Sequence, residues 1–165
     1  MTQFTTERLI VSGVDMAAAH LQNYTLLEEV ITLLTPAVVA PLPAYFQGIN
    51  DIDAAKDWLV KITDDSELLL VRCRQSHQLL GLVFIHFDCQ LAHIGYLIRQ
   101  QNWRQGLASE LLSELIIQMR TVENLTCLMA GVSADNRSSM HLLQKLGFVN
   151  ITKDQGDSLH YQLTL

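Results

Sequence analysis

The fold is decided by a turn between two regular segments, which reads Gln101-Asn102-Trp103-Arg104-Gln105-Gly106-Leu107-Ala108. Residues 91–98 before it have strand character, and apolar side chains after it recur at 108, 111, 112, 115, 116 and 119, which predicts a helix with one apolar face. Amides at a helix N-terminus lack carbonyl partners, and the peptide dipoles favour an anion there. Gly106 removes a side chain where a phosphate needs close approach, so we predict an anion site at this turn.

A second motif opens the next predicted helix. Asn136-Arg137-Ser138-Ser139 begins it, and the segment ends Lys145-Leu146-Gly147-Phe148. Asn136 can cap the helix or bind an amide of a ligand, and Gly147 suits a left-handed turn at the C-terminus. Each motif alone also fits an ordinary connection between regular elements, because short motifs carry a high risk of chance matches. Their combination and spacing favour a shared function.

The two motifs, with Ile94-Gly95-Tyr96 before them, resemble the GNAT acetyltransferases. The pyrophosphate loop of that family reads Gln or Arg, two variable residues, Gly, a variable residue, then Gly or Ala, and a later helix carries Asn-x-x-Ser. The opening Thr6-Glu7-Arg8-Leu9-Ile10 is similar to the first strand of the branch that acetylates ribosomal-protein N-termini. That branch often has Trp where this chain has Trp103, but usually Gly in place of Arg104.

The resemblance implies an α+β fold: one GNAT-like domain over residues 1–165, with a mixed central sheet, splayed central strands and flanking helices. It also implies acetyl-CoA as co-substrate without a metal. The backbone of Leu97 and Ile98 would hold pantetheine as an added strand does, with the thioester near Tyr96 and Ser139. The cofactor-binding residues implied are Leu97, Ile98, Trp103, Arg104, Gln105, Gly106, Leu107, Ala108, Asn136 and Ser139.

The implied reaction is direct attack of an amine on the thioester, with His93, Ser139 and Tyr96 as catalytic candidates. Many relatives carry a Tyr proton donor where this chain has Leu143, so Ser139 is the nearest replacement, although capping or cofactor contact is the commoner task of such a Ser. The related branch often has Glu in place of His93, whose imidazole titrates near pH ~6.5 and suits a base. A structural role for His93 stays open, and a bulge near Gly95 would bring His93 and Tyr96 to one side.

The acceptor is expected to be an amine on a peptide, a protein N-terminus or a small molecule. Specificity should come from the first 65 residues, where Tyr45 and Phe46 either form a lip over the thioester or pack the loop. The runner-up function is an acyl-CoA-binding regulatory protein without efficient transfer, because the expected Tyr and Glu are replaced by Leu143 and His93. A Rossmann domain is disfavoured, since no G-x-G-x-x-G follows a strand.

The remaining pattern predicts the other elements. Strands are expected over Phe4 to Val14, Leu68 to Arg74, Leu79 to Phe87 and Leu125 to Val132, with a closing hairpin of Phe148 to Lys153 and Ser158 to Leu165. Helices are expected over Leu26 to Leu34, after Asp51 and Asp53 through Ile62, over Arg137 to Lys145, and from Met16 to Leu21 with Asp15 as cap. Thr35 to Asn50 is expected to be irregular because of Pro36, Pro41 and Pro43.

The composition of the chain limits the kinds of partner that it is expected to bind. The formal charge of −6, with 11 Lys and Arg residues, opposes binding to nucleic acid. Apolar runs are too short to span a membrane, and no secretory signal is visible, so we expect a cytoplasmic protein, either a monomer or a homodimer. Cys73, Cys89 and Cys127 form no C-x-x-C pair and are expected to be reduced thiols rather than disulfide or zinc ligands.

Overall fold

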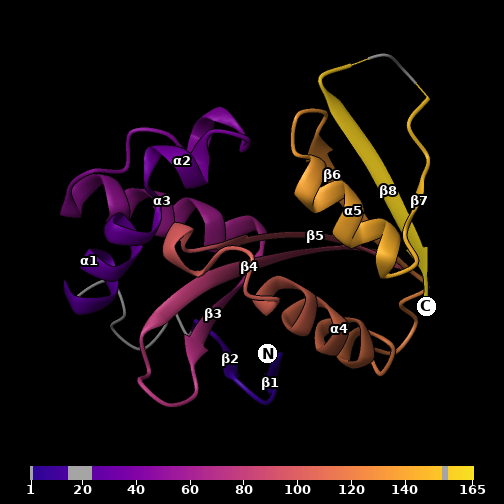
Figure 1. The fold of residues 1–165 in the computed structure, drawn as a ribbon, viewed down its shortest axis with the longest axis horizontal. Helices are drawn as coiled ribbons and strands as arrows, with labels where there is room; N and C mark the ends of the chain where they lie inside the picture. The colour runs from indigo at the N-terminus through magenta and orange to yellow at the C-terminus, as the bar shows by residue number, and fades with distance from the viewer. Residues whose placement is uncertain (1, 15–23, 154–155) are drawn as a thin grey trace.

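The computed structural model describes residues 2–14, 24–153 and 156–165, which form one eight-stranded sheet flanked by helices (Figure 1). The strand order is β1-β2-β3-β4-β5-β6-β8-β7, and among neighbouring strands only β5 and β6 run parallel. The strands are β1 Gln3–Thr5, β2 Leu9–Gly13, β3 Glu67–Cys73, β4 Leu79–Asp88, β5 Leu91–Ile98, β6 Cys127–Ser133, β7 Val149–Asn150 and β8 Ser158–Thr164. The mixed sheet confirms the predicted α+β class.

Helices cover both faces of this sheet. They are α1 Tyr24–Leu33, α2 Pro36–Val39, α3 Ile52–Asp65, α4 Leu107–Met119 and α5 Arg137–Lys145, with the 3-10 turns η3 Ala44–Phe46 and η4 Gln100–Asn102. One buried cluster joins α4 and α5 to the sheet through residues such as Leu111, Leu115 and Leu143. A second cluster joins α1, α2 and α3 to the opposite face through residues such as Val30, Val38 and Leu59. Figure 1 shows α2 and α3 above β4 and β5, α1 at the left and α4 below these strands.

The central β5–α4–β6 unit contains the expected splay. The parallel pairing of β5 with β6 runs from Leu91↔Cys127 to Ile94↔Ala130 and stops there. Both strands continue, β5 to Ile98 and β6 to Ser133. In Figure 1, β8 turns away from the direction of β4 and β5. The two central strands therefore separate beyond Ile94 and Ala130.

The prediction of a single strand over Phe4 to Val14 was wrong, because the chain turns back after β1 and pairs β1 with β2. Thr6 makes this turn. Its amide donates to the carbonyl of Leu9 at 2.9 Å, and its hydroxyl accepts from the Leu9 amide at 3.0 Å. A threonine side chain that bonds nearby backbone competes with strand pairing in this way.

The expectation of an irregular segment from Thr35 to Asn50 was also wrong in part. Pro36 begins α2 rather than breaking it, because the first turn of a helix needs no N–H donor at that position. Asp51 then caps α3 by accepting from the Ala54 amide at 2.8 Å, and α3 extends to Asp65, one turn past Ile62, the last apolar residue named for the predicted helix. The predicted helix from Met16 to Leu21 and its cap Asp15 lie outside the described residues.

The elements nearest the two motifs agree closely with the sequence. β5 and α5 have the predicted bounds, and β7 pairs with β8 as the closing hairpin requires, although β7 is only two residues long. In the described part of the chain, no helix combines the length and apolar character needed to cross a membrane.

Candidate active site

A cavity of about 500 Å³ occupies the place where β5 and β6 separate. Its walls come from β5, β6 and the start of α5, from the segment that follows α2, and from the start of β8. The lining residues are Ala40, Pro41, Leu42, Pro43, Ile94, Gly95, Tyr96, Ala130, Gly131, Val132, Ser133, Asn136, Ser139, Leu143, Asp157, Ser158 and His160. The cavity is therefore built from segments spread over most of the chain.

Strand alternation divides this lining between the two faces of the sheet. Ile94 and Tyr96 pack with the cluster that contains α4 and α5, whereas Leu97 belongs to the cluster that contains α1–α3. The register of β4 with β5 runs without a shift from Gly81↔Ile98 to Asp88↔Leu91, so the bulge expected near Gly95 is absent from these strands. His93 and Tyr96 consequently lie on opposite faces.

Tyr96 and Ser139 meet on one wall of the cavity. The phenol of Tyr96 donates a hydrogen bond to Ser139 Oγ at 3.0 Å, which links β5 to α5. Burial raises the pKa of Tyr96 above its ordinary value, and the hydrogen bond with Ser139 opposes that rise only in part. The phenol therefore keeps its proton at neutral pH. Leu143 lines the same cavity one turn further along α5.

Asn136 fulfils the capping role considered for it. Its side-chain oxygen accepts a hydrogen bond from the Ser139 amide at 3.1 Å at the start of α5. This bond fixes the first turn of α5 and with it the position of Ser139. Asn136 also lines the cavity.

The turn before α4 presents a row of unpaired amides. Among the described residues, the backbone N–H groups of residues 104–109 have no hydrogen-bond acceptor. Arg104 and Gly106 both adopt left-handed backbone conformations, with φ of 59° and 76°. Successive N–H groups in such a turn form a concave site for an anion, which the dipole of α4 reinforces. The φ of Arg104 also explains why a glycine suits that position.

The backbone groups of Leu97 and Ile98 point in different directions. Arg99 N–H donates to the Leu80 carbonyl at 2.7 Å, and hydrogen-bonded pairs alternate along an antiparallel ladder, so the backbone of Leu97 faces β4. The backbone groups of Tyr96 and Ile98 face the gap instead. Trp103 Nε1 already donates to the Ile98 carbonyl at 2.7 Å, which ties the amide-rich turn to the end of β5.

His93 is exposed and does not line the cavity. Its ring centroid is 6.2 Å from that of His86 on the neighbouring strand. By alternation, His93 shares the face of Gly95 on β5, and His160 on β8 lies on the same face, since Tyr161 points into the opposite cluster. The two imidazoles thus lie on the α1–α3 face of the sheet.

The aromatic pair in the loop after α2 separates into two environments. Phe46 is buried and packs against Trp58 and Phe84, with ring centroids 5.6 and 5.3 Å away. Tyr45 is 49% exposed and rests on Phe46. The cavity is lined instead by Ala40 to Pro43 from this region. Sequence reasoning also missed Asp157 and His160, because nothing in a short hairpin pattern indicates which residues reach a distant gap.

Comparison with known proteins gives one family match and several structural ones. The family model of the acetyltransferase (GNAT) domain matches residues 21–149. The uncharacterized N-acetyltransferase YoaA of Bacillus subtilis (strain 168) is 36% identical over 78 residues, which are 46% of this chain and 44% of that protein. The chain thus matches less than half the length of this curated relative.

Two solved structures share the fold over nearly the whole chain. RimL, described as a ribosomal L7/L12 alpha-N-protein acetyltransferase in complex with coenzyme A, has a TM-score of 0.76 at 15% identity, covering 97% of this chain and 96% of that one. A point mutant of SpeG spermidine N-acetyltransferase from Vibrio cholerae has a TM-score of 0.72 at 16% identity, covering 96% of this chain and 95% of that one.

Proposed function

The chain belongs to the GNAT acetyltransferase family, and from this premise we propose that it transfers an acetyl group from acetyl-CoA to a primary amine. The observation that carries the proposal is the separation of β5 from β6 beyond Ile94 and Ala130, which leaves a cavity lined by Tyr96 and Ser139. The turn that follows β5 adds the amides of residues 104–109, which have no acceptor among the described residues. Acetyl-CoA supplies an activated acyl group as a thioester. Direct attack in a ternary complex then needs no covalent enzyme intermediate.

The described residues fit this co-substrate in two places. The amides of residues 104–109 suit its pyrophosphate, with Trp103, Arg104, Gln105, Gly106, Leu107 and Ala108 forming the loop. The guanidinium of Arg99, whose buried Nε has no partner among the described residues, adds positive charge beside the loop. The gap-facing backbone of Tyr96 and the Ile98 amide suit pantetheine, and Asn136 and Ser139 border its path.

Tyr96 is proposed as the acid that protonates the departing thiolate. Its phenol lines the cavity and keeps its proton because burial raises its pKa. Ser139 accepts the phenol hydrogen bond and thereby fixes the direction of the hydroxyl. In this account Tyr96 on β5 performs the task that many relatives give to a tyrosine at the position of Leu143.

His93 is proposed as the base that receives the proton of the attacking amine. It is two residues before Gly95 and lies on the α1–α3 face, opposite the face that carries Tyr96. An acid and a base on opposite faces of the sheet would prevent direct proton exchange between them. His160 lies on the same face as His93 and is the natural comparison.

The acceptor is proposed to be a peptide, a protein N-terminus or a small-molecule amine, acting in the cytoplasm. Asp157 is an acidic side chain of the cavity lining, and the net charge of the chain is −6, which together favour a cationic amine. RimL is named for a ribosomal-protein acceptor and SpeG for the polyamine spermidine, so the shared fold favours neither kind of acceptor.

A product assay tests the proposal. Labelled acetyl-CoA is incubated with the protein and a mixed panel of peptides, polyamines, amino acids and aminoglycosides, and acetylated products are identified by mass spectrometry. Acetylation of one class with release of free CoA supports the proposal. Leu143 in the cavity favours a second candidate, a regulatory acyl-CoA-binding protein. Tight CoA binding without product from any amine would favour that candidate.

A further inference from the structure

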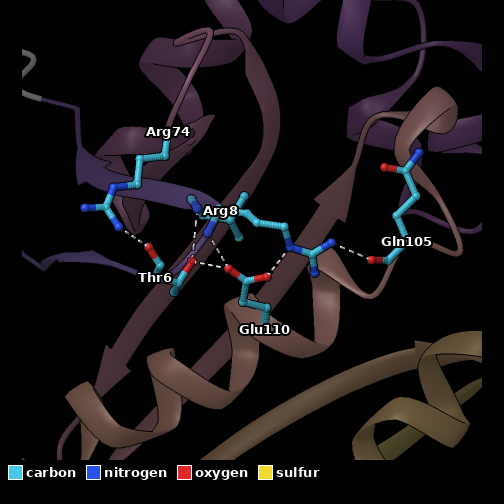
Figure 2. A network of polar contacts seen from close by, with 6 residues as sticks. Thr6, Arg8, Arg74, Gln105 and Glu110 are labelled. Carbon is cyan, nitrogen blue, oxygen red and sulfur yellow. Dashed lines mark hydrogen bonds and ion pairs between the residues drawn. The ribbon is translucent and has the colours of Figure 1, made fainter.

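Arg8 reaches the amide-rich turn from the other end of the chain. It lies in the turn between β1 and β2, and Figure 2 shows its guanidinium between Glu110 and Gln105. Arg8 Nη1 donates to the carbonyl oxygen of Gln105 at 2.8 Å, across 97 residues of sequence. Arg8 Nε donates to Glu110 Oε2 at 2.6 Å, across 102 residues. The β1–β2 turn is thus bonded directly to the loop that precedes α4.

The carboxylate of Glu110 holds Arg8 in this position. Its Oε1 accepts from the Thr6 hydroxyl and from the Arg8 backbone amide, the latter at 2.8 Å, while its Oε2 accepts from the guanidinium (Figure 2). Desolvation raises the pKa of Glu110, but the hydrogen bonds from Thr6 and Arg8 outweigh it and leave the pKa below its ordinary value. Arg74 completes the network with a bond to the Thr6 carbonyl at 3.2 Å.

The contact with Gln105 fixes the direction of a loop amide. A trans peptide is planar, and its C=O and N–H point in opposite directions. Because the Gln105 carbonyl points at Arg8, the Gly106 N–H of the same peptide must point away from Arg8. Arg8 also takes the carbonyl that the Ser109 amide would use in a regular helix, and the Ser109 amide has no acceptor among the described residues.

The pair also balances charge at the start of α4. Glu110 lies in the first turn of this helix, close to the loop that would receive an anion. An unpaired carboxylate there would repel a phosphate. The guanidinium of Arg8 neutralises the negative charge of Glu110. The Nη2 atom of Arg8 also lies 3.5 Å from the position that a Cβ on Gly106 would occupy. The network therefore removes negative charge from the loop while orienting its amide.

We propose that Arg8 is a positioning residue for the cofactor, which, held by Glu110, orients the Gln105–Gly106 peptide so that its N–H meets the pyrophosphate of acetyl-CoA. This inference rests on the proposed function, because it assigns a role within the same loop. It adds a residue that neither the loop motif nor the cavity lining contains.

Calorimetry on Arg8→Lys with two ligands tests the inference. Lysine keeps the positive charge but lacks the planar fork that bonds Glu110 and Gln105 together. Affinity for CoA should fall roughly ten-fold, as for one lost hydrogen bond to a charged group, while affinity for pantetheine, which has no phosphate, should stay unchanged. In kinetics the loss should fall on KM for acetyl-CoA more than on kcat. The matched control is Arg74→Lys, which alters the same network without touching the loop.

Glu110→Gln provides a second variant, because it keeps an acceptor for Thr6 while weakening the hold on Arg8. The same selective loss of CoA affinity supports the inference. Unchanged CoA affinity in both variants overturns it, and so does an equal loss of CoA and pantetheine binding, which would make the network a folding element only. If the unmodified protein binds no CoA, the proposed function itself fails, and the two failures are thereby distinguished.

Discussion

The hydroxyls of Tyr96 and Ser139 are joined by a hydrogen bond of 3.0 Å across one wall of the cavity between β5 and β6. This bond links the strand that ends at the amide-rich turn to the helix that carries the second motif. It places a protonated phenol beside the gap at a point where the last helix offers only Leu143.

Tyr96→Phe should lower kcat by about 10²-fold while leaving KM for acetyl-CoA nearly unchanged, because it removes the proposed acid without removing the ring. Steady-state kinetics with acetyl-CoA and the acceptor check this. Tyr161→Phe is the matched control, since Tyr161 is also buried but does not line the cavity. A near-native kcat for Tyr96→Phe would remove the phenol from the mechanism. In the unmodified protein, the alkaline limb of the kcat profile should follow the pKa of Tyr96, which burial holds above its ordinary value.

His93→Ala should lower kcat by at least about 10²-fold, with little change in affinity for acetyl-CoA, if the imidazole accepts the proton of the amine. His160→Ala is measured in parallel, since His160 lies on the same face. A large loss of kcat in His160→Ala, with near-native kcat in His93→Ala, would show that His160 on β8 and not His93 accepts the proton.

Gly106→Val should weaken CoA binding without unfolding the protein, because a branched side chain would occupy the space that a phosphate needs. The substitution also strains the backbone, since Gly106 has φ of 76°. Gly48→Val supplies the control, because Gly48 has φ of 75° and open space around it, outside the cavity lining. Both variants should lose similar thermal stability, and only Gly106→Val should lose CoA affinity in calorimetry. If the two variants bound CoA with equal affinity, the loop at Gly106 would not be part of the CoA site.

Glu110→Gln should make the free energy of unfolding depend less on pH in the acid range. The pKa of Glu110 is lowered in the folded state, so its contribution to the free energy of unfolding is present above the unfolded value, near ~4.3, and is lost as pH falls through the folded value. Thermal unfolding of both proteins from pH 7 to below pH 4 measures the difference. If both proteins lost the same thermal stability as the pH falls, the Arg8–Glu110 contact would make no pH-dependent contribution to the free energy of unfolding.

The sequence predicted the site best where the residue pattern of one segment and the backbone conformation of that segment require the same residues. β5 and α5 have the predicted bounds because alternation and a strong cap define them, and Gly106 has the left-handed conformation that glycine favours. The turn at Thr6 was missed because its hydroxyl competes with strand pairing, which no apolar pattern records. The opposite faces of His93 and Tyr96 follow from an unshifted register that only the pairing of whole strands reveals.

Long-range contacts account for the rest of what sequence reasoning missed. Arg8 and Gln105 are 97 residues apart, and their contact depends on the β1–β2 turn lying against the start of α4. The reach of Asp157 and His160 into the cavity likewise depends on where β8 lies beside β6. Side-chain type and spacing within one segment do not predict these long-range contacts, because the order of the strands in the sheet creates them.

A crystal structure of the protein with bound CoA would show where each part of the cofactor lies. The pyrophosphate should lie on the amides of residues 104–109, pantetheine should run through the gap between β5 and β6, and the thiol should end near the Tyr96 hydroxyl. The Gly106 amide should point at a phosphate oxygen and the Gln105 carbonyl at Arg8. CoA bound elsewhere, with the gap between β5 and β6 empty, would contradict the account.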